Sequence, residues 1–394
     1  MARRIVSVDV FRGLTIALMI LVNNPGSWAH IYPPFRHAEW FGVTPTDWVF
    51  PFFLFIVGTS IVLAYHQRDT RNRKTYKRIF TRTVKLILLG WFLAGFQVRF
   101  PFFKPLSELR IPGVLVRIGI VFFFGALIYL FLKFLEQRYG RKLALIVLSG
   151  FILILTAGYW YVMLGKYQLQ GVATESLIET RLNKTDNLVS QIDRKILGVQ
   201  HMWRHYEPDE GKTVQGNYDP EGLLSTLPAL ATVLLGMLLG YILISFRSPM
   251  RRLFWIGVAG IISLSAGYVW APYFPFSKKL WTSSFVFYTA GLAFLIFGIV
   301  YFMSEFCKRK AWMLPWVAFG MNAIAVYVLN GLIAKSFYQI KIGDTSLHNW
   351  IFSHTWRLWI KSPEAASLGY ALSVVLFYAL IARWLYKHKI FIKV

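Results

Sequence analysis

Three residues that could do chemistry lie close together near the start of the chain, between two strongly apolar stretches. They are Asn23 at the end of the first stretch, His37 in a short aromatic segment, and Asp47 just before the second stretch. A neutral imidazole accepts a proton near neutral pH, and an adjacent carboxylate or amide can fix its tautomer. These residue types predict a catalytic histidine. The structural alternative is a solvated loop histidine, with Asp47 or Thr46 only capping the next helix.

A few charged or amide residues interrupt the apolar stretches, where they are energetically costly. Asp9 and Arg12 are three residues apart, so on a helix they share a face and can pair, either as an ion pair at the membrane interface or toward a ligand. Arg117 stands about one and a half turns past Pro112. That depth predicts a partner acid or an anionic ligand. Asn322 should hydrogen-bond to a neighbouring helix or to a ligand.

Two further segments place charges at helix entrances. Asp219 and Glu221 precede an apolar stretch, where carboxylates either cap the positive end of a helix or bind substrate. Lys278 and Lys279 lie in a basic, aromatic segment before another apolar stretch.

We expect no metal site. His201 and His205 have the spacing of a helical metal pair, but the glutamate of an HExxH motif and a clear third ligand are missing. The single cysteine, Cys307, excludes an internal disulfide framework and a cysteine-rich metal cluster.

The elements that must position these residues are membrane helices. Of the 394 residues, 56% are hydrophobic and 15% are charged, whereas soluble domains carry about 25% charged residues. A helix needs about 20 apolar residues to cross the hydrocarbon core. The sequence therefore predicts an all-α polytopic membrane protein with about ten transmembrane helices, at residues 5–24, 47–66, 84–102, 112–135, 143–163, 223–245, 253–270, 283–303, 314–334 and 368–386.

The charge pattern sets the expected orientation. The chain has 43 Lys and Arg against 18 acidic residues, a net charge of +25, which in a soluble protein would suggest nucleic-acid binding. With ten spans, most basic residues fall into loops on one side, the cytoplasmic side, so both termini are expected there and nucleic acid is not an expected partner. We interpret residues 1–394 as one domain with an extracytoplasmic insertion of short amphipathic helices at 165–222.

Ordered motifs from residue 3 to about 330 carry a family resemblance. They are Ser7-Val8-Asp9-Val10-Phe11-Arg12-Gly13, Arg36-His37-Ala38-Glu39-Trp40, Thr44-Pro45-Thr46-Asp47, Arg110-Ile111-Pro112-Gly113, Ile192-Asp193-Arg194, Tyr218-Asp219-Pro220-Glu221-Gly222 and Gly320-Met321-Asn322. The chain resembles the heparan-alpha-glucosaminide N-acetyltransferase family and its bacterial NagX-like members. The resemblance implies a transmembrane enzyme that moves acetyl from cytoplasmic acetyl-CoA to the amino group of an amino sugar across the membrane.

The resemblance also implies roles for residues. His37, in the family's His-Ala-x-Trp motif, would be the base or the acetyl acceptor, Asn23 an oxyanion donor and Asp47 the group that orients the imidazole. The remaining candidates are Arg12, Arg117, Asp9 and Asn322 for acetyl-CoA, and Asp219, Glu221, Lys279 and Trp40 for the sugar.

The expected setting follows from the same resemblance. The lysosomal member carries an additional luminal domain and first helix, so we expect a bacterial inner-membrane protein, surrounded by lipid and forming a homodimer like its relatives. The competing interpretation is a secondary transporter or exporter of sugars or glycolipids without acyl chemistry, with the buried charges lining its pathway.

Overall fold

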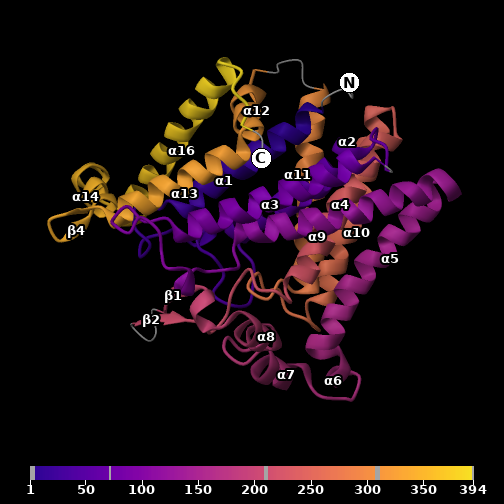
Figure 1. Ribbon diagram of the computed structural model, residues 1–394, viewed down its shortest axis with the longest axis horizontal. Coiled ribbons are helices and arrows are strands. Elements are labelled where there is room, and N and C mark those ends of the chain that lie inside the picture. Colours follow the sequence, from indigo (N-terminus) through magenta and orange to yellow (C-terminus); the bar gives the residue numbers. More distant parts are fainter. Residues whose placement is uncertain (1–4, 71, 208–211, 307–310, 393–394) are drawn as a thin grey trace.

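The computed structural model describes residues 5–70, 72–207, 212–306 and 311–392. Long helices make up most of the molecule (Figure 1). They are α1 (Val6–Asn23), α2 (Val49–Tyr65), α3 (Arg73–Gly95), α4 (Val114–Tyr139), α5 (Arg141–Trp160), α9 (Thr226–Ser245), α10 (Pro249–Trp270), α11 (Ser283–Phe306), α12 (Met313–Met321), α13 (Ala323–Gln339) and α16 (Pro363–Lys387). The described part of the chain confirms an all-α polytopic membrane fold.

The number of spans differs from the predicted ten. In the described residues, eight helices are long and apolar enough to cross a membrane, and a ninth span results if the bent pair α12 and α13 is counted as one. The predicted span at 84–102 is wrong in its bounds. α3 begins at Arg73, so its first turns are basic, and it ends at Gly95, where a short loop returns and Phe96 pairs with Phe103.

The predicted continuous helix at 314–334 is also wrong. The chain bends by 78° between α12 and α13, and Asn322 lies at the break with a non-helical backbone (φ −117°, ψ 28°). Its side-chain amide donates to the carbonyl of Ile390 (3.0 Å), and its oxygen accepts from the amide of Ile392 (3.0 Å). Asn322 therefore fixes the C-terminal segment to the break.

Both ends of the described chain lie at the same end of the helical assembly (Figure 1). Asn322 contacts the C-terminal segment, and Arg12 near the start of α1 contacts the carbonyl of the nearby Gly320 (3.4 Å). This agrees with termini on one side of the membrane. Some of the basic residues in the loops predicted to be cytoplasmic lie outside the described residues, as does Cys307; these basic residues are Arg3, Arg4, Arg71, Lys308, Arg309, Lys310 and Lys393.

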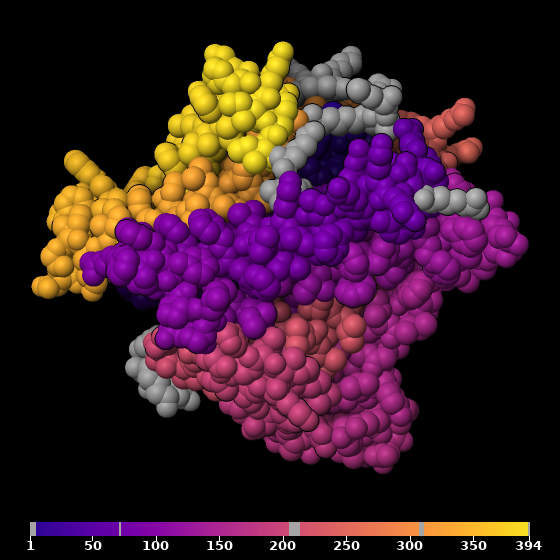
Figure 2. Space-filling view, viewed as in Figure 1, coloured from indigo at the N-terminus to yellow at the C-terminus, as the bar shows by residue number. Residues whose placement is uncertain are grey.

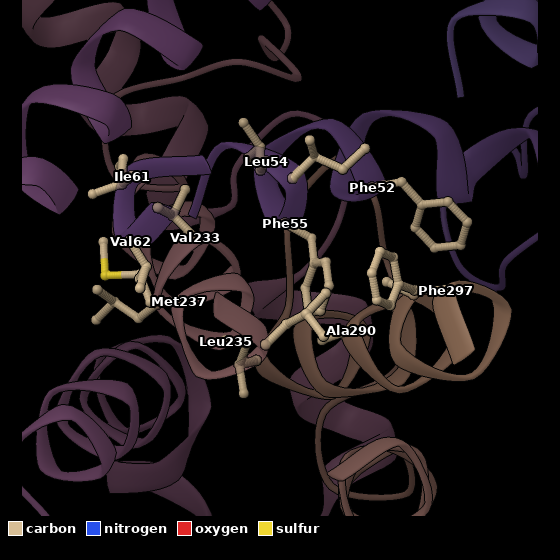
Figure 3. Packing of buried hydrophobic residues seen from close by; sticks show 14 of the residues in the cluster. Phe52, Leu54, Phe55, Ile61, Val62, Val233, Leu235, Met237, Ala290 and Phe297 are labelled. Carbon is tan, nitrogen blue, oxygen red and sulfur yellow. The ribbon is translucent and has the colours of Figure 1, made fainter. Parts of the chain in front are cut away.

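The apolar core lies where α2, α9 and α11 pack together. Figure 3 shows Phe55 of α2, Val233 of α9 and Phe297 of α11 among its side chains. α2 and α9 approach closely because glycines face backbone at their crossing: a Cβ on Gly58 would lie 1.8 Å from the carbonyl oxygen of Val233, and one on Gly236 would lie 1.9 Å from that of Phe55. Small residues allow this approach in membrane helices.

The insertion projects from the opposite end from the termini (Figures 1 and 2). It contains the expected short helices, together with a two-stranded hairpin that the sequence analysis did not predict. The elements are α6 (Lys166–Gln168), α7 (Thr174–Arg181), α8 (Leu188–Leu197), β1 (Arg204–Glu207) and β2 (Lys212–Gln215).

A smaller projection precedes α16. It consists of β3 (Lys341–Ile342), β4 (Thr345–Ser346), α14 (Leu347–His354) and α15 (Trp356–Trp359). It contacts the end of α1, since His348 Nε2 lies 3.1 Å from the carbonyl oxygen of Pro25.

Candidate active site

His37 and Asp47 form a close pair in the segment that joins α1 to α2. His37 Nδ1 lies 2.6 Å from Asp47 Oδ1. A carboxylate only accepts hydrogen bonds, so Nδ1–H is the donor and the lone pair of the neutral ring is on Nε2. The Asp47 side chain is 1% exposed, whereas the His37 side chain keeps 35% of its surface accessible. The pair therefore offers an accessible base that is oriented by a buried carboxylate.

Asp47 is itself fixed by the start of the helix that follows. Its Oδ2 accepts from the amides of Ala38 (3.0 Å) and Thr44 (3.1 Å). Thr44 is the N-cap of the one-turn helix Pro45–Trp48, and Asp47 is the third residue of a reciprocal capping box. The expectation that Thr46 or Asp47 is the N-cap is wrong, but Asp47 does combine a capping role with the orientation of His37.

Lys278, from the loop between α10 and α11, completes the group. Its Nζ lies 3.1 Å from His37 Nδ1 and 3.5 Å from Asp47 Oδ1. Partial removal from water, together with this ammonium group, lowers the pKa of His37 below its ordinary value, although Asp47 opposes the effect. Burial likewise lowers the pKa of Lys278. His37 is therefore held in the neutral form that accepts a proton or an acyl group.

A cavity of about 470 Å³ lies beside this group. Helices α1, α2, α4 and α13 contribute to its wall, as do the loops that carry the charged residues. Its lining includes Asn23, His37, Arg110, Glu221, Lys278, Lys279 and Tyr327. Asn23 is exposed at the end of α1, so two of the three proposed catalytic residues line one cavity, and the third supports His37 from behind.

Arg110 binds the two acidic residues that precede α9. Its guanidinium makes two hydrogen bonds to Asp219 (2.6 and 3.0 Å) and one to Glu221 (2.5 Å). The two carboxylates raise the pKa of Arg110 against the effect of its burial, and Arg110 lowers the pKa of Glu221. Arg110 and Glu221 reach the cavity wall, while Asp219 is buried behind Arg110. Asp219 therefore positions the wall from outside the cavity.

The other two residues proposed for the sugar differ in position. Lys279 lines the cavity, with its Nζ 5.2 Å from the ring centre of Trp203 and 5.7 Å from that of Tyr218. Trp40 is buried, packs against Tyr218, and donates its indole N–H to the carbonyl of Leu182 (2.6 Å). Trp40 thus joins the His37 segment to the insertion.

The residues proposed for acetyl-CoA are spread over two ends of the molecule. Arg12 pairs with Asp9 (3.4 Å), as predicted, and donates to Ser60 Oγ (2.8 Å). It lies eleven residues before Asn23 on α1, about 16 Å along the helix. Asn322 lies near Arg12, since both contact the region of the α12 break.

Arg117 belongs to the end that carries His37. It is 1% exposed and donates to the carbonyl of Gly222 (2.9 Å) and to Ser225 Oγ (2.5 Å). Its guanidinium also lies 5.2 Å from the ring centre of Trp281. The predicted partner acid is not among these hydrogen-bond partners, which are a backbone carbonyl and a serine hydroxyl from the segment that leads into α9.

Sequence reasoning singled out Lys279 and Arg117 but missed Lys278 and Arg110 as site residues. The sequence signals were present, because each missed residue lies in a motif that was noted. A loop sequence does not indicate which of two adjacent lysines contacts His37, and Tyr327 carried no signal at all within an apolar helix.

Metal binding has no support in the described residues, among which no group of three or more His, Cys, Asp and Glu side chains could hold an ion. The side chain of His205, considered above with His201, lies outside the described part of the chain.

Comparison with known proteins indicates a family. Residues 4–178 match the family described as heparan-alpha-glucosaminide N-acetyltransferase, catalytic. The mouse heparan-alpha-glucosaminide N-acetyltransferase is 30% identical over 437 aligned residues, which include all of this chain and 61% of the mouse protein. The human protein of that name is 28% identical, with 99% of this chain and 60% of the human protein aligned.

The chain therefore spans about three fifths of the length of these relatives. The family match includes α1 to α5 and the His37 segment, and the full-length alignments extend the similarity through α16. These matches support the heparan-alpha-glucosaminide N-acetyltransferase family for this chain, which is similar to the mouse and human proteins of that name along its whole length.

Proposed function

We propose that this protein is an integral membrane acetyltransferase that moves acetyl from cytoplasmic acetyl-CoA to the amino group of a glucosamine-type sugar on the extracytoplasmic side. The observation that carries the proposal is the accessible His37, oriented by the buried Asp47 in the wall of a cavity. Similarity to this family supports the reaction class, since the curated relatives are N-acetyltransferases by name.

The chemistry needs a base and an oxyanion donor. In direct transfer, His37 Nε2 takes a proton from the attacking amine, a C–N bond forms at the thioester carbonyl, the C–S bond breaks, and coenzyme A leaves as the thiol with that proton. In the two-step route, Nε2 itself attacks the thioester carbon, the C–S bond breaks, and coenzyme A leaves as the thiolate. The amine then attacks the acetyl carbon, the bond from that carbon to Nε2 breaks, and the amine proton passes to the released imidazole. In both routes the amide of Asn23, on the same cavity, would donate to the developing oxyanion.

The electrostatics favour the neutral imidazole that both routes require. A protonated imidazole beside the Lys278 ammonium would place two positive charges about 3 Å apart, which disfavours that state. Asp47 stabilises the imidazolium that forms during proton transfer. The barrier to proton transfer is therefore lowered even though His37 is neutral before the reaction.

The decisive experiment uses the full chain in lipid nanodiscs with radiolabelled acetyl-CoA and glucosamine. We expect labelled N-acetylglucosamine from the native protein and a loss of about 10²–10⁴-fold in rate for His37→Ala. His354→Ala is the matched control, because His354 is exposed on α14 and should retain full activity. Full activity of His37→Ala would overturn the proposal.

Two further measurements complete the test. Rapid quenching without acceptor should leave label on the His37 peptide in the two-step route and none in direct transfer. Proteoliposomes with acetyl-CoA on one side should acetylate sugar on the other. Sugar flux without any acetyl donor, together with no transfer when the donor is present, would instead favour the transporter interpretation.

A further inference from the structure

A second cavity of about 760 Å³ adjoins the one beside His37. The two share six lining residues: Asn23, Arg110, Val114, Leu115, Trp203 and Tyr327. Because Asn23 and Arg110 face both spaces, a ligand of more than one ring can occupy both while its reacting group stays beside His37. We call the larger space the second chamber.

The lining of the second chamber is cationic. Lys104, Arg204 and Lys335 contribute positive charges, and Glu108 contributes one negative charge. Arg110 also lines the chamber, but Asp219 and Glu221 already compensate its charge. The lining therefore carries more positive than negative charge. Because these positive side chains surround one space, their fields add there.

Hydrogen-bond donors reinforce this charge. The amide side chains of Asn23, Gln200, Gln215 and Asn330 line the same chamber. So do Gly113, Val114 and Leu115 at the N-terminus of α4, a helix of 26 residues. The first N–H groups of a helix have no intrahelical acceptors, and the helix dipole favours negative charge there.

The cations are held by different parts of the fold. Lys335 on α13 donates to the carbonyls of Leu93 and Ala94 at the end of α3 (3.1 Å to Ala94). Lys104 belongs to the loop after α3, whose backbone is tied back by the bond from its amide to the Gly95 carbonyl (2.8 Å). Arg204 comes from β1 of the insertion. Three separate segments thus bring positive charge to one space.

We infer that the second chamber binds an anionic group, a phosphate or a carboxylate, on the same ligand whose reacting end lies beside His37. This inference rests on the proposed function for the identity of the reacting end. The group belongs either to the acceptor, as in a sugar phosphate or an acidic glycan, or to coenzyme A. In either case the chamber selects acidic ligands over neutral ones of the same size.

Binding to the full chain in nanodiscs tests this inference without turnover. Isothermal titration would compare glucosamine with glucosamine 6-phosphate, and coenzyme A with 3′-dephospho-coenzyme A. We expect the phosphate to tighten Kd by about tenfold or more in one pair, and that pair identifies the source of the anion. The preference should weaken as ionic strength rises. Equal affinities within both pairs would overturn the inference.

Single substitutions locate the effect. Lys335→Met and Arg204→Gln should each reduce the preference for the phosphorylated ligand by about tenfold. The affinity for the other ligand of the pair, which lacks that phosphate, should stay unchanged. Lys341→Gln, an exposed lysine on β3 just beyond α13, is the matched control. If both variants keep the native preference, the chamber is not the anion site.

Activity separates this inference from the proposed function. In an active enzyme, the chamber variants should raise KM for the preferred ligand and leave kcat nearly constant, because the anion is bound equally in the ground and transition states. If no transfer occurs but the phosphate preference and its loss in Lys335→Met persist, the inference stands while the acetyltransferase proposal fails.

Discussion

His37 and Lys278 lie 3.1 Å apart, Nδ1 to Nζ, although 241 residues separate them in sequence. Both contact Oδ1 of Asp47. The contact joins the segment between α1 and α2 to the loop between α10 and α11, so the local charge at His37 is set by tertiary structure. It also makes the protonation of His37 depend on a residue that performs no step of the reaction itself.

The first prediction concerns pH. The neutral imidazole is the active form, and burial together with Lys278 lowers the pKa of His37 below 6.5. Activity should therefore persist below pH 6.5 and fall as pH drops through the lowered pKa. In Lys278→Met that pKa rises, so the acidic limb of kcat/KM should move to higher pH. Lys279→Met should move it less, since Lys279 lowers the pKa of His37 less than Lys278 does.

The pH profile of acetyl-CoA hydrolysis in the absence of amine is the cleanest measurement, because the acceptor amine then adds no titration of its own. An acidic limb that stays in place in Lys278→Met would show that Lys278 does not tune His37.

The second prediction concerns Asp47→Asn. The new amide still accepts from the amides of Ala38 and Thr44 through its oxygen, which leaves its NH₂ facing His37. Nδ1 must then accept, the proton moves to Nε2, and the base is lost. We expect kcat/KM to fall by about 10²–10⁴-fold. Unfolding followed by circular dichroism should show only a small loss of stability, so that a loss of activity does not reflect a loss of folding. Native activity in this variant would contradict the role assigned to Asp47.

The third prediction concerns Arg110→Gln. The substitution leaves the buried carboxylates of Asp219 and Glu221 without their cation. Removal of one partner from a buried charge cluster costs about 3–5 kcal/mol. A clear drop in Tm in detergent is expected, whereas Lys142→Gln, at an exposed position, should leave Tm unchanged.

A compensated variant refines this prediction. Arg110→Gln combined with Asp219→Asn and Glu221→Gln removes both uncompensated charges and should recover part of the lost Tm. If the triple variant is no more stable than Arg110→Gln alone, charge burial is not the cause of the instability.

The fourth prediction concerns the crossing of α2 and α9. Gly58→Ala places a Cβ 1.8 Å from the carbonyl oxygen of Val233, so the two helices must separate. Overpacking of this kind costs about 1–3 kcal/mol or more. We expect a lower Tm and a smaller monodisperse fraction in size-exclusion chromatography. Gly257→Ala on α10 is the control, because its added Cβ meets no atom within 4 Å.

The local sequence determined the helical class of the fold and most of the apolar helices, because a hydrocarbon core admits only backbones that satisfy their own hydrogen bonds. It failed at α3, whose first turns are basic, and at Asn322, where an apolar run conceals a bend. The bend is stabilised by the distant residues Ile390 and Ile392. A local pattern carries no information on such contacts.

The candidate site divides in the same way. The types and spacing of Asn23, His37 and Asp47 left both a catalytic histidine and a solvated loop histidine open, and the family resemblance supplied the proposed roles. The structure brings His37 and Asp47 together because both lie within one short connection whose ends are fixed by α1 and α2. The ordered motifs also indicated the resemblance to a family. Local sequence thus supplied the candidate for the reactive group, and the motifs supplied the expected class of chemistry.

Tertiary structure alone decided what surrounds that group. Lys278 rather than Lys279 contacts His37, Arg110 rather than Arg117 lines the cavity, and Lys335 faces the second chamber. These choices depend on helix rotation and loop direction, which are set by packing between segments far apart in the chain. Charges act through distance in space, so the electrostatics of the site exist only once the helices have assembled.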